Sequence, residues 1–430
     1  MSLTNLPRLW HRLFLEERPS ISLSLFRITI ALTVGLHVIP SLLQIQDNYL
    51  ATAFRQINPS FFPTTVLRLA AQSPDVLVWA FAALFCVSWL TFLIGLCTQA
   101  SCFLMIFSCY YFYALNSLHI GTLSWDILLV TLFLMCVTPY PGDYFSMDGL
   151  LRGDPQAYRR QRPFFLQRLL QLQIATTYFF TGLCKITAGG NWLHANPISY
   201  LVNSGSDSVV KEFFGRAWLA QHPTLCFAIG ITVIACELSM PFLLFIRRTR
   251  LVAIGMGCIF HVLLVTTLHV PTLFFFHFPP QLMLFIDPRT IIAWIERRRE
   301  RWRSLNHGVL VYDGRCGFCL ASVRRLQVLD LFGYIQLVDY HTYQDVRQLH
   351  PSLDVATCHS QMHVVEPGRL SGGFQAFQRL TLKLPLLWLL APIFYLPGMR
   401  WIGGKVYRWV AQNRYLFHRS NVCADNHCAI

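Results

Sequence analysis

The sequence predicts a polytopic α-helical membrane bundle of about eight spans, followed by a small α/β domain. Only 13% of the 430 residues are charged and 54% are hydrophobic, whereas a soluble globular protein has roughly 25% charged residues. The mean hydropathy of +0.45 agrees with this deficit of charge. Apolar runs fill the first two thirds of the chain, and the composition changes after a basic stretch near residue 300. These observations exclude a wholly soluble protein, a disordered chain and a small disulfide-framework protein.

The apolar runs approach the roughly 20 residues that a helix needs to cross a bilayer. Eight stretches qualify, at 22–43, 76–96, 101–115, 123–138, 164–186, 224–246, 251–268 and 272–286. With the N-terminus inside, the basic clusters at 152–162, 247–250 and 297–303 all fall on the inner side. The outer loops hold only Arg55, Arg68, Lys211 and Arg216. Because cytoplasmic loops carry excess Lys and Arg, we expect the N-terminus and the C-terminal domain to be cytoplasmic.

The same loops explain the net charge. The chain has 35 Lys and Arg against 21 Asp and Glu, a balance of +14, which in a soluble protein would suggest nucleic acid. Here the basic residues lie between apolar runs, so we expect the lipid bilayer as partner and no nucleic acid. Residues 1–19 lack the cleavage site of a signal peptide. We expect an integral protein of a bacterial inner membrane.

Four segments follow from these patterns. They are a cytoplasmic N-terminal segment (1–20), a transmembrane domain (21–290), a basic linker (291–306) and an α/β domain (307–430). In the last of these, strands are predicted at 308–312, 334–339 and 362–365, and helices at 320–331 and 374–382. Residues 384–396 are more apolar than such a domain needs. Their prolines favour a buried or interfacial segment over a ninth span.

A Cys-x-x-Cys motif, Cys316 to Cys319, lies where a strand passes into a helix. A thiolate at a helix N-terminus is stabilised by the helix dipole and by free backbone N–H groups, and two intervening residues let the second thiol attack a mixed disulfide on the first. Redox chemistry is the leading interpretation. A zinc site with Cys358 and His359, or with Cys423, His427 and Cys428, and a pair of inert thiols are the alternatives. Most other cysteines lie in apolar runs, where they pack as small hydrophobes.

The stretch Tyr312-Asp313-Gly314-x-Cys316-x-x-Cys319 resembles the signature of the DCC family of predicted thiol-disulfide oxidoreductases, a thioredoxin-like group. The likeness covers most of about the last 120 residues, including 372–376 and 407–415. It implies a thioredoxin-like fold, with Cys316 as the attacking thiol, Cys319 as the resolving thiol and Asp313 as the acidic residue of the signature. It also implies a thiol or disulfide protein as partner. Cys423 and Cys428 are either a second shuttle pair or part of a plain surface tail.

Five ionisable side chains lie inside predicted spans, where a charge is expensive and indicates function by default. They are Arg27, Asp126, Lys185, Glu237 and His261. Arg27 can instead extend to the inner interface, and Asp126 lies close enough to an outer end to be solvated. Glu237 and His261 can pair with each other as a structural contact between helices.

Lys185 follows Tyr178-Phe-Phe-Thr-Gly-Leu-Cys at the outer end of the fifth span, with Trp192 just beyond. A lysine buried in an apolar setting can act as a general base. The structural alternative is a lysine that reaches the outer interface beside a tryptophan belt. The residues alone leave both interpretations open.

Several segments of the transmembrane domain resemble the HTTM domain, which is shared with vitamin K-dependent gamma-glutamyl carboxylase. They are 26–27, 146–150, 178–192, 247–250 and 260–261, in that order. The likeness implies that Lys185 stands where the carboxylase has the base that deprotonates vitamin K hydroquinone. It places Glu237 and His261 in core helices, and with Trp192 and Tyr178 these residues form a candidate site for a quinone or hydroquinone. The chain departs from the carboxylase at Gly121-Thr122, where an Asn-His pair is expected.

We therefore expect a membrane-bound thiol-disulfide oxidoreductase that uses the Cys-x-x-Cys pair and is coupled to a membrane domain binding a quinone-like cofactor. One alternative is a vitamin K-dependent carboxylase-like enzyme that modifies a peptide or protein at the outer face. A second is a non-enzymatic maturation or transport scaffold. The charge pattern places Cys316 on the inner side and Lys185 near the outer face, so direct contact between the two sites is not expected.

Overall fold

The computed structural model of the protein describes residues 8, 10–50, 65, 68–69, 72–115, 123–187, 192–203, 211–269, 273–305, 307–414 and 416. Contacts divide the chain into two compact units. The first comprises Met1–Ser146 and Gln161–Pro288, and the second comprises Met147–Arg160 and Arg289–Ile430. Residues 147–160, which lie between the fourth and fifth predicted spans, therefore fold with the C-terminal unit.

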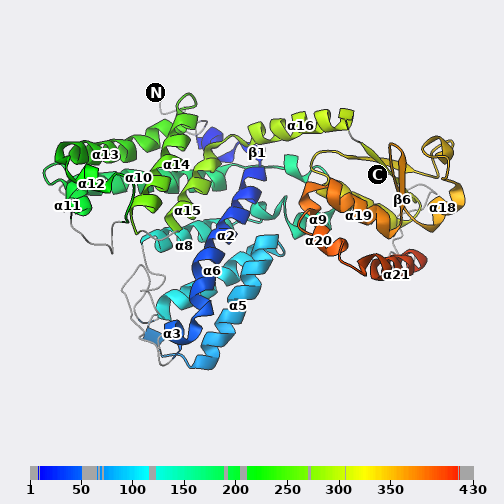
Figure 1. Ribbon diagram of the computed structural model, residues 1–430, viewed down its shortest axis with the longest axis horizontal. Coiled ribbons are helices and arrows are strands. Elements are labelled where there is room, and N and C mark those ends of the chain that lie inside the picture. Colours follow the sequence, from blue (N-terminus) through cyan, green and yellow to red (C-terminus); the bar gives the residue numbers. More distant parts are fainter. Residues whose placement is uncertain are drawn as a thin grey trace. The chain divides into compact units, whose positions relative to one another are not determined.

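Each of the eight apolar stretches forms a helix (Figure 1). These helices are α2 (Ile21–Leu43), α5 (Asp75–Ile94), α6 (Thr98–Leu115), α8 (Leu123–Cys136), α10 (Phe165–Thr187), α13 (Pro223–Phe245), α14 (Arg250–Thr267) and α15 (Leu273–Leu282). Shorter elements of the first unit are η2 (His11–Leu15), β1 (Glu17–Pro19), α3 (Ile45–Tyr49), η3 (Tyr140–Gly142), β2 (Gln161–Pro163), α11 (Pro197–Asn203), α12 (Arg216–Ala220) and η5 (Met283–Phe285). Strands β1 and β2 pair antiparallel, with Arg18 opposite Arg162.

Four of these helices, α2, α5, α13 and α14, are long and apolar enough to cross a membrane. Helix α10 has the same length as α2 but carries Gln167, Arg168 and Lys185 among its polar residues, so it is less apolar. Helix α15 has only ten residues. Among the described residues the structure thus supports an integral membrane protein with four clear span-length helices, and the count of eight stays a prediction.

The first unit packs its helices in two groups. Helix α2 contacts α5, and α5 contacts α6, while α10 packs on α13 and α13 on α14 (Figure 1). Buried Phe26, Phe85 and Phe112 belong to the core of the first group. Tyr178 and Met240 belong to the core of the second. Helix α15 contacts both α2 and α14, so it joins the two groups.

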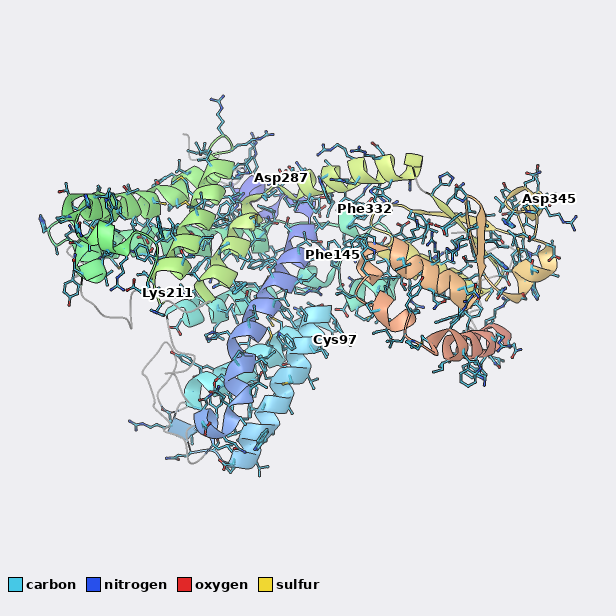
Figure 2. The ribbon with its side chains drawn as sticks, in the orientation of Figure 1. Cys97, Phe145, Lys211, Asp287, Phe332 and Asp345 are labelled. Atoms are coloured by element: carbon cyan, nitrogen blue, oxygen red, sulfur yellow. The ribbon has the colours of Figure 1, made fainter. Side chains whose placement is uncertain are left out.

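Arg27 is enclosed by protein. Its side chain is 0% exposed and its guanidinium donates a hydrogen bond to the carbonyl of Phe145, which the side-chain view labels (Figure 2). Helix α5 ends at Gly95, a left-handed C-cap with φ +70°. A Cβ atom at Gly95 would overlap the guanidinium of Arg27, so glycine is required both for the backbone conformation and for the space.

The second unit is built on a four-stranded sheet of order β4-β3-β5-β6. Strands β3 (Gly308–Tyr312) and β4 (Ile335–Asp339) run parallel, and β5 (His363–Glu366) and β6 (Arg369–Gly372) pair antiparallel. The helical elements are α9 (Met147–Arg152), η4 (Ala157–Arg159), α16 (Pro288–Leu305), α17 (Gly317–Leu329), η6 (Val346–Gln348), α18 (Val355–Ser360), α19 (Phe374–Lys383), η7 (Pro385–Leu387), α20 (Ala391–Phe394) and α21 (Met399–Asn413). Phe332, labelled in Figure 2, stacks on Trp302 of α16.

Alternating side chains of β3 supply two cores. Leu310 and Tyr312 pack with Leu320 of α17 and Leu380 of α19. Val311 points to the other face, where Val346, Leu353 and Cys358 are buried. This alternation is the consequence of the two-residue repeat of a strand. The three predicted strands and two predicted helices of this domain are confirmed within a few residues, whereas β6 was missed.

The apolar stretch 384–396 is not one helix. It contains two short helical elements, η7 and α20, and Leu390 is the N-cap of α20. A proline lies in the first turn of each element. With three and four residues, neither element is long enough to cross a bilayer.

Replacing Gly95 by alanine is expected to destabilise the first unit by about 1–3 kcal/mol. The new methyl group would collide with the Arg27 guanidinium, and the alanine backbone would have to adopt an unfavourable positive φ. Thermal unfolding of the full chain in lipid nanodiscs measures the loss. Gly255→Ala in α14 is the matched control, because no atom lies within 4 Å of a Cβ there. Equal melting temperatures for the two variants would contradict the packing described.

Candidate functional site

The Cys-x-x-Cys motif begins directly after the sheet. Strand β3 ends at Tyr312, and Cys316 is the N-cap of α17 with extended backbone angles of φ −93° and ψ 110°. The Sγ atom of Cys316 accepts the backbone N–H of Cys319 at 3.3 Å. The thiol thus takes the place of the serine or aspartate oxygen that usually caps a helix. Both cysteines are free thiols.

The two thiols are not equivalent. The hydrogen bond from the Cys319 thiol, with smaller help from the Cys319 N–H and from Arg414, lowers the pKa of Cys316 to about 7, although burial and Asp313 oppose this. The same hydrogen bond, together with burial, raises the pKa of Cys319. Cys316 is therefore the thiol that ionises near neutral pH, and Cys319 keeps its proton.

The two thiols differ in exposure. Cys316 is only 1% exposed, whereas Cys319 lines a cavity of about 290 Å³. The cavity is mostly apolar, and its walls include the rings of Phe318, Phe374, Phe377, Phe394 and Tyr407. The Tyr407 hydroxyl accepts the backbone N–H of Met362 at 3.0 Å. The arrangement suits an apolar group brought next to a thiol.

A buried carboxylate organises the edge of the sheet beside the thiols. Asp313 is 3% exposed and accepts hydrogen bonds from His341 Nε2 at 2.9 Å and from the Arg414 guanidinium at 3.0 Å. Asp339, opposite Tyr312 in the parallel strand, accepts the N–H of Gly314 at 3.0 Å. A Cβ atom at Gly314 would collide with that carboxylate. The turn between β3 and the thiols is therefore fixed by two carboxylates.

Sequence reasoning missed three of these residues. His341, Asp339 and Arg414 were given no role, although Arg414 lies within the segment that resembles the DCC family. One signal was present for Asp339, because it ends a predicted strand and the carboxyl ends of parallel strands meet at one edge. Nothing in local spacing indicated that Arg414 meets Asp313, since the two are 101 residues apart.

In the first unit, Lys185 and Glu237 form an ion pair between α10 and α13. The Lys185 Nζ atom lies 2.8 Å from Oε1 and 2.7 Å from Oε2 of Glu237, and 5.4 Å from the centroid of the Trp192 ring. The helices come close at Gly182, where a Cβ would lie 3.0 Å from Cβ of Glu237. A small residue at the crossing thus allows the carboxylate to reach the lysine.

Tyr178 and His261 form the second contact of this unit. The tyrosine hydroxyl lies 2.8 Å from Nε2 of the histidine, and the imidazole stacks on Phe278 with ring centroids 5.0 Å apart. His261 is 3% exposed, and its Nδ1 has no hydrogen-bond partner among the described residues. Glu237 and His261, for which a pair with each other was one alternative, each have a partner on α10 instead.

The eight predicted site residues therefore form three clusters. Cys316, Cys319 and Asp313 lie together in the second unit. Lys185, Glu237 and Trp192 form one cluster of the first unit, and Tyr178 with His261 forms another.

The zinc alternative finds no support in the part of the chain that the structure describes. No group of three or more His, Cys, Asp or Glu side chains there is arranged to hold a metal ion. His359 bonds to the Tyr340 hydroxyl at 2.9 Å, and Cys358 is buried in the core. Cys423, His427 and Cys428 lie outside the described residues.

Comparison with known families gives two matches, one after the other along the chain. The family model of the HTTM domain matches residues 16–289, more than half of the chain. The model of the DCC1-like thiol-disulfide oxidoreductase matches residues 310–420. No curated protein and no solved structure gives a match. The chain therefore belongs to the HTTM family and carries a DCC1-like thiol-disulfide oxidoreductase domain after its HTTM domain.

Proposed function

We propose that the protein is a membrane-bound thiol-disulfide oxidoreductase in which Cys316 and Cys319 exchange electrons with a thiol or disulfide partner. The observation that carries this proposal is Cys316 at the N-terminus of α17, where it accepts the N–H of Cys319 and has a pKa of about 7. A thiolate is the nucleophile in disulfide exchange, and the best attacking thiol has a pKa near the ambient pH.

The exchange proceeds in two balanced steps. The Cys316 thiolate attacks a partner disulfide, so that a mixed disulfide forms and one partner sulfur leaves as a thiolate. Cys319 then loses its proton and attacks Cys316 of the mixed disulfide, which releases the second partner sulfur. The protein is left with a Cys316–Cys319 disulfide, and the partner has gained two electrons. Asp313 positions the turn that carries Cys316 and holds Arg414 next to it.

We also propose that the second unit is a thioredoxin-like domain. Its first strand leads into the motif helix, a parallel strand follows, and two antiparallel strands complete the sheet before α19. A Cys-x-x-Cys beside a β-α-β pattern is typical of thioredoxin-like redox proteins.

For the HTTM domain we propose a quinone-like cofactor held near the Lys185–Glu237 pair and the Tyr178–His261 pair. The support is the gathering of hydrogen-bonding side chains on the facing helices α10, α13 and α14, since polar groups at membrane depth are expensive to maintain. A quinone that takes two electrons and two protons from the reduced thiols leaves a disulfide and a hydroquinone, and a partner dithiol that reverses the exchange described above restores the two thiols. Because a quinone dissolves in the bilayer, the two sites need not touch.

The alternative functions have weaker support. Both carboxylate oxygens of Glu237 lie within hydrogen-bond distance of the Lys185 ammonium. A substrate of a carboxylase-like enzyme would therefore have to compete with Glu237 for the base. The scaffold alternative would be favoured by a metal-bound thiol pair, and the described residues offer no third and fourth ligand.

We further propose a bacterial inner membrane location, with the N-terminus and the thiol domain in the cytoplasm. The basic loops support this orientation. Cytosolic thiols are kept reduced, so the pair would act in the reducing direction or as a redox sensor.

The rate of Cys316 alkylation is expected to rise with pH around an inflection near pH 7. In Cys319→Ala the largest cause of the low pKa is lost, so the inflection moves to higher pH. The rate at pH 7 then falls roughly tenfold for each pKa unit. Mass spectrometry of the Cys316 peptide from the reduced full chain measures the rate of alkylation at each pH. Cys358→Ala is the control and keeps the inflection near 7. An unmoved inflection in Cys319→Ala would show that the second thiol does not activate the first.

Lys185→Met or Glu237→Gln alone is expected to lower the free energy of unfolding by about 3–5 kcal/mol, because one buried charge loses its partner. The double change Lys185→Met/Glu237→Leu recovers most of this loss. If the pair contributes to a cofactor site, the double variant folds normally but no longer binds a short-chain benzoquinone in a calorimetric titration. Lys211→Met, whose ammonium contacts only the carbonyl of Val265 among the described residues, is the control. Unchanged quinone binding in the double variant would assign the pair a purely structural role.

In intact cells a membrane-impermeant maleimide is expected to leave Cys316 and Cys319 unlabelled, whereas a permeant maleimide labels them. The reason is the cytoplasmic position that the charge pattern predicts. Lysed cells treated with the impermeant reagent provide the control for burial of the thiols. Labelling in intact cells at the level found after lysis would reverse the proposed orientation.

A further inference from the structure

The C-terminal unit exposes a row of large apolar side chains from the turn before α20 to the end of α21. Leu389 is 91% exposed, Trp401 is 65% exposed and Trp409 is 58% exposed. Others in the same stretch are Trp388, Ile393, Leu396, Ile402 and Val406. Soluble domains rarely expose apolar surface in such a concentration, and where they do it marks an interaction site.

The fold of the unit does not need this surface. Helix α21 attaches to α19 and α20 through its other side. At Gly403 the helix comes so close to Phe374 that a Cβ would overlap the ring. Tyr407 of the same side bonds to Met362. Helix α21 therefore has a packed face and a second apolar face that is exposed.

The charge of the region is of one sign. Between Ser371 and Arg414 the sequence has six basic residues and no acidic residue. Arg379 and Lys383 pair with Glu366, and Arg414 pairs with Asp313. The remaining three, Arg400, Lys405 and Arg408, are exposed and form no ion pair with any described carboxylate. The Lys405 ammonium lies 3.7 Å above the centroid of the Trp401 ring.

We propose that α20 and the outer face of α21 form a docking surface for an anionic lipid bilayer. A helix with tryptophan and aliphatic side chains on one face, flanked by Lys and Arg, lies in the plane of a membrane interface. Its indoles sit at headgroup level and its cations attract anionic lipid. The cations of this surface have no acidic residue among them over 371–414, which is the charge pattern that anionic lipid attracts.

Docking has a consequence for the thiols. Val406 and Tyr407 of α21, with Phe394 of α20, also line the cavity that contains Cys319. A bilayer seated on this face would border the cavity that leads to the redox pair, and the substrate class able to enter from there is apolar and membrane-dissolved. The docking itself does not depend on the thiol chemistry.

The test uses the full chain in nanodiscs whose acyl chains carry bromine, a quencher of indole fluorescence. The difference in emission between the wild-type chain and Trp401→Phe/Trp409→Phe isolates the two exposed indoles. We expect brominated phosphatidylglycerol to quench most of this difference signal, and brominated phosphatidylcholine to quench less of it. Each removed cation weakens docking roughly fivefold, so Lys405→Gln/Arg408→Gln shifts the ratio of docked to undocked chains roughly thirtyfold, a loss that high salt reproduces.

Arg347→Gln/Arg369→Gln removes two exposed cations from the same unit away from α21 and is the matched control, with quenching as in the wild type. An unchanged pH profile of Cys316 alkylation shows that each variant is folded. Two results would overturn the proposal. If aqueous acrylamide quenches the two indoles and brominated lipid does not, the face is free in solution. If neither quencher reaches them, a protein surface covers the face.

Discussion

The carboxylate of Asp313 joins parts of the C-terminal unit that are far apart in the sequence. It lies at the end of β3, bonds to His341 after β4, and pairs with Arg414 at the end of α21. A charge buried to this degree is stable only when it is paired and hydrogen-bonded. This buried group therefore helps to fix the end of α21, and with it the wall of the cavity beside Cys319.

The asymmetry of the two thiols follows from the same geometry. Cys316 is held at the start of α17 by the turn that Asp313 and Asp339 fix, so its sulfur points at the free N–H groups of the helix. The helix N-terminus and the second thiol then favour the thiolate at Cys316. The position of the Cys316 sulfur thus depends on two carboxylates that fix the backbone of the turn, and a Cβ atom at Gly314 would collide with one of them, Asp339.

Charged side chains of the first unit also have hydrogen-bond or ion-pair partners. Arg27 is buried and donates to a backbone carbonyl, Lys185 pairs with Glu237, and Arg162 pairs with Asp143 at 2.9 Å. In a segment without water each charge needs such a partner. The partners come from distant helices and loops, so these contacts help to set which helices are neighbours.

The sequence by itself determined the membrane class, the positions of the apolar helices, the order of the two family domains and the Cys-x-x-Cys motif. These properties rest on local signals, because hydropathy, period and spacing are written in neighbouring residues. The tertiary structure decided which side chains the charged residues contact. Glu237 meets Lys185 instead of His261, Arg27 is enclosed by Gly95 and Phe145, and Arg414 reaches Asp313 across 101 residues. Such contacts depend on how helices and strands pack, and a single sequence carries no local mark of which distant side chain will lie opposite a given charge.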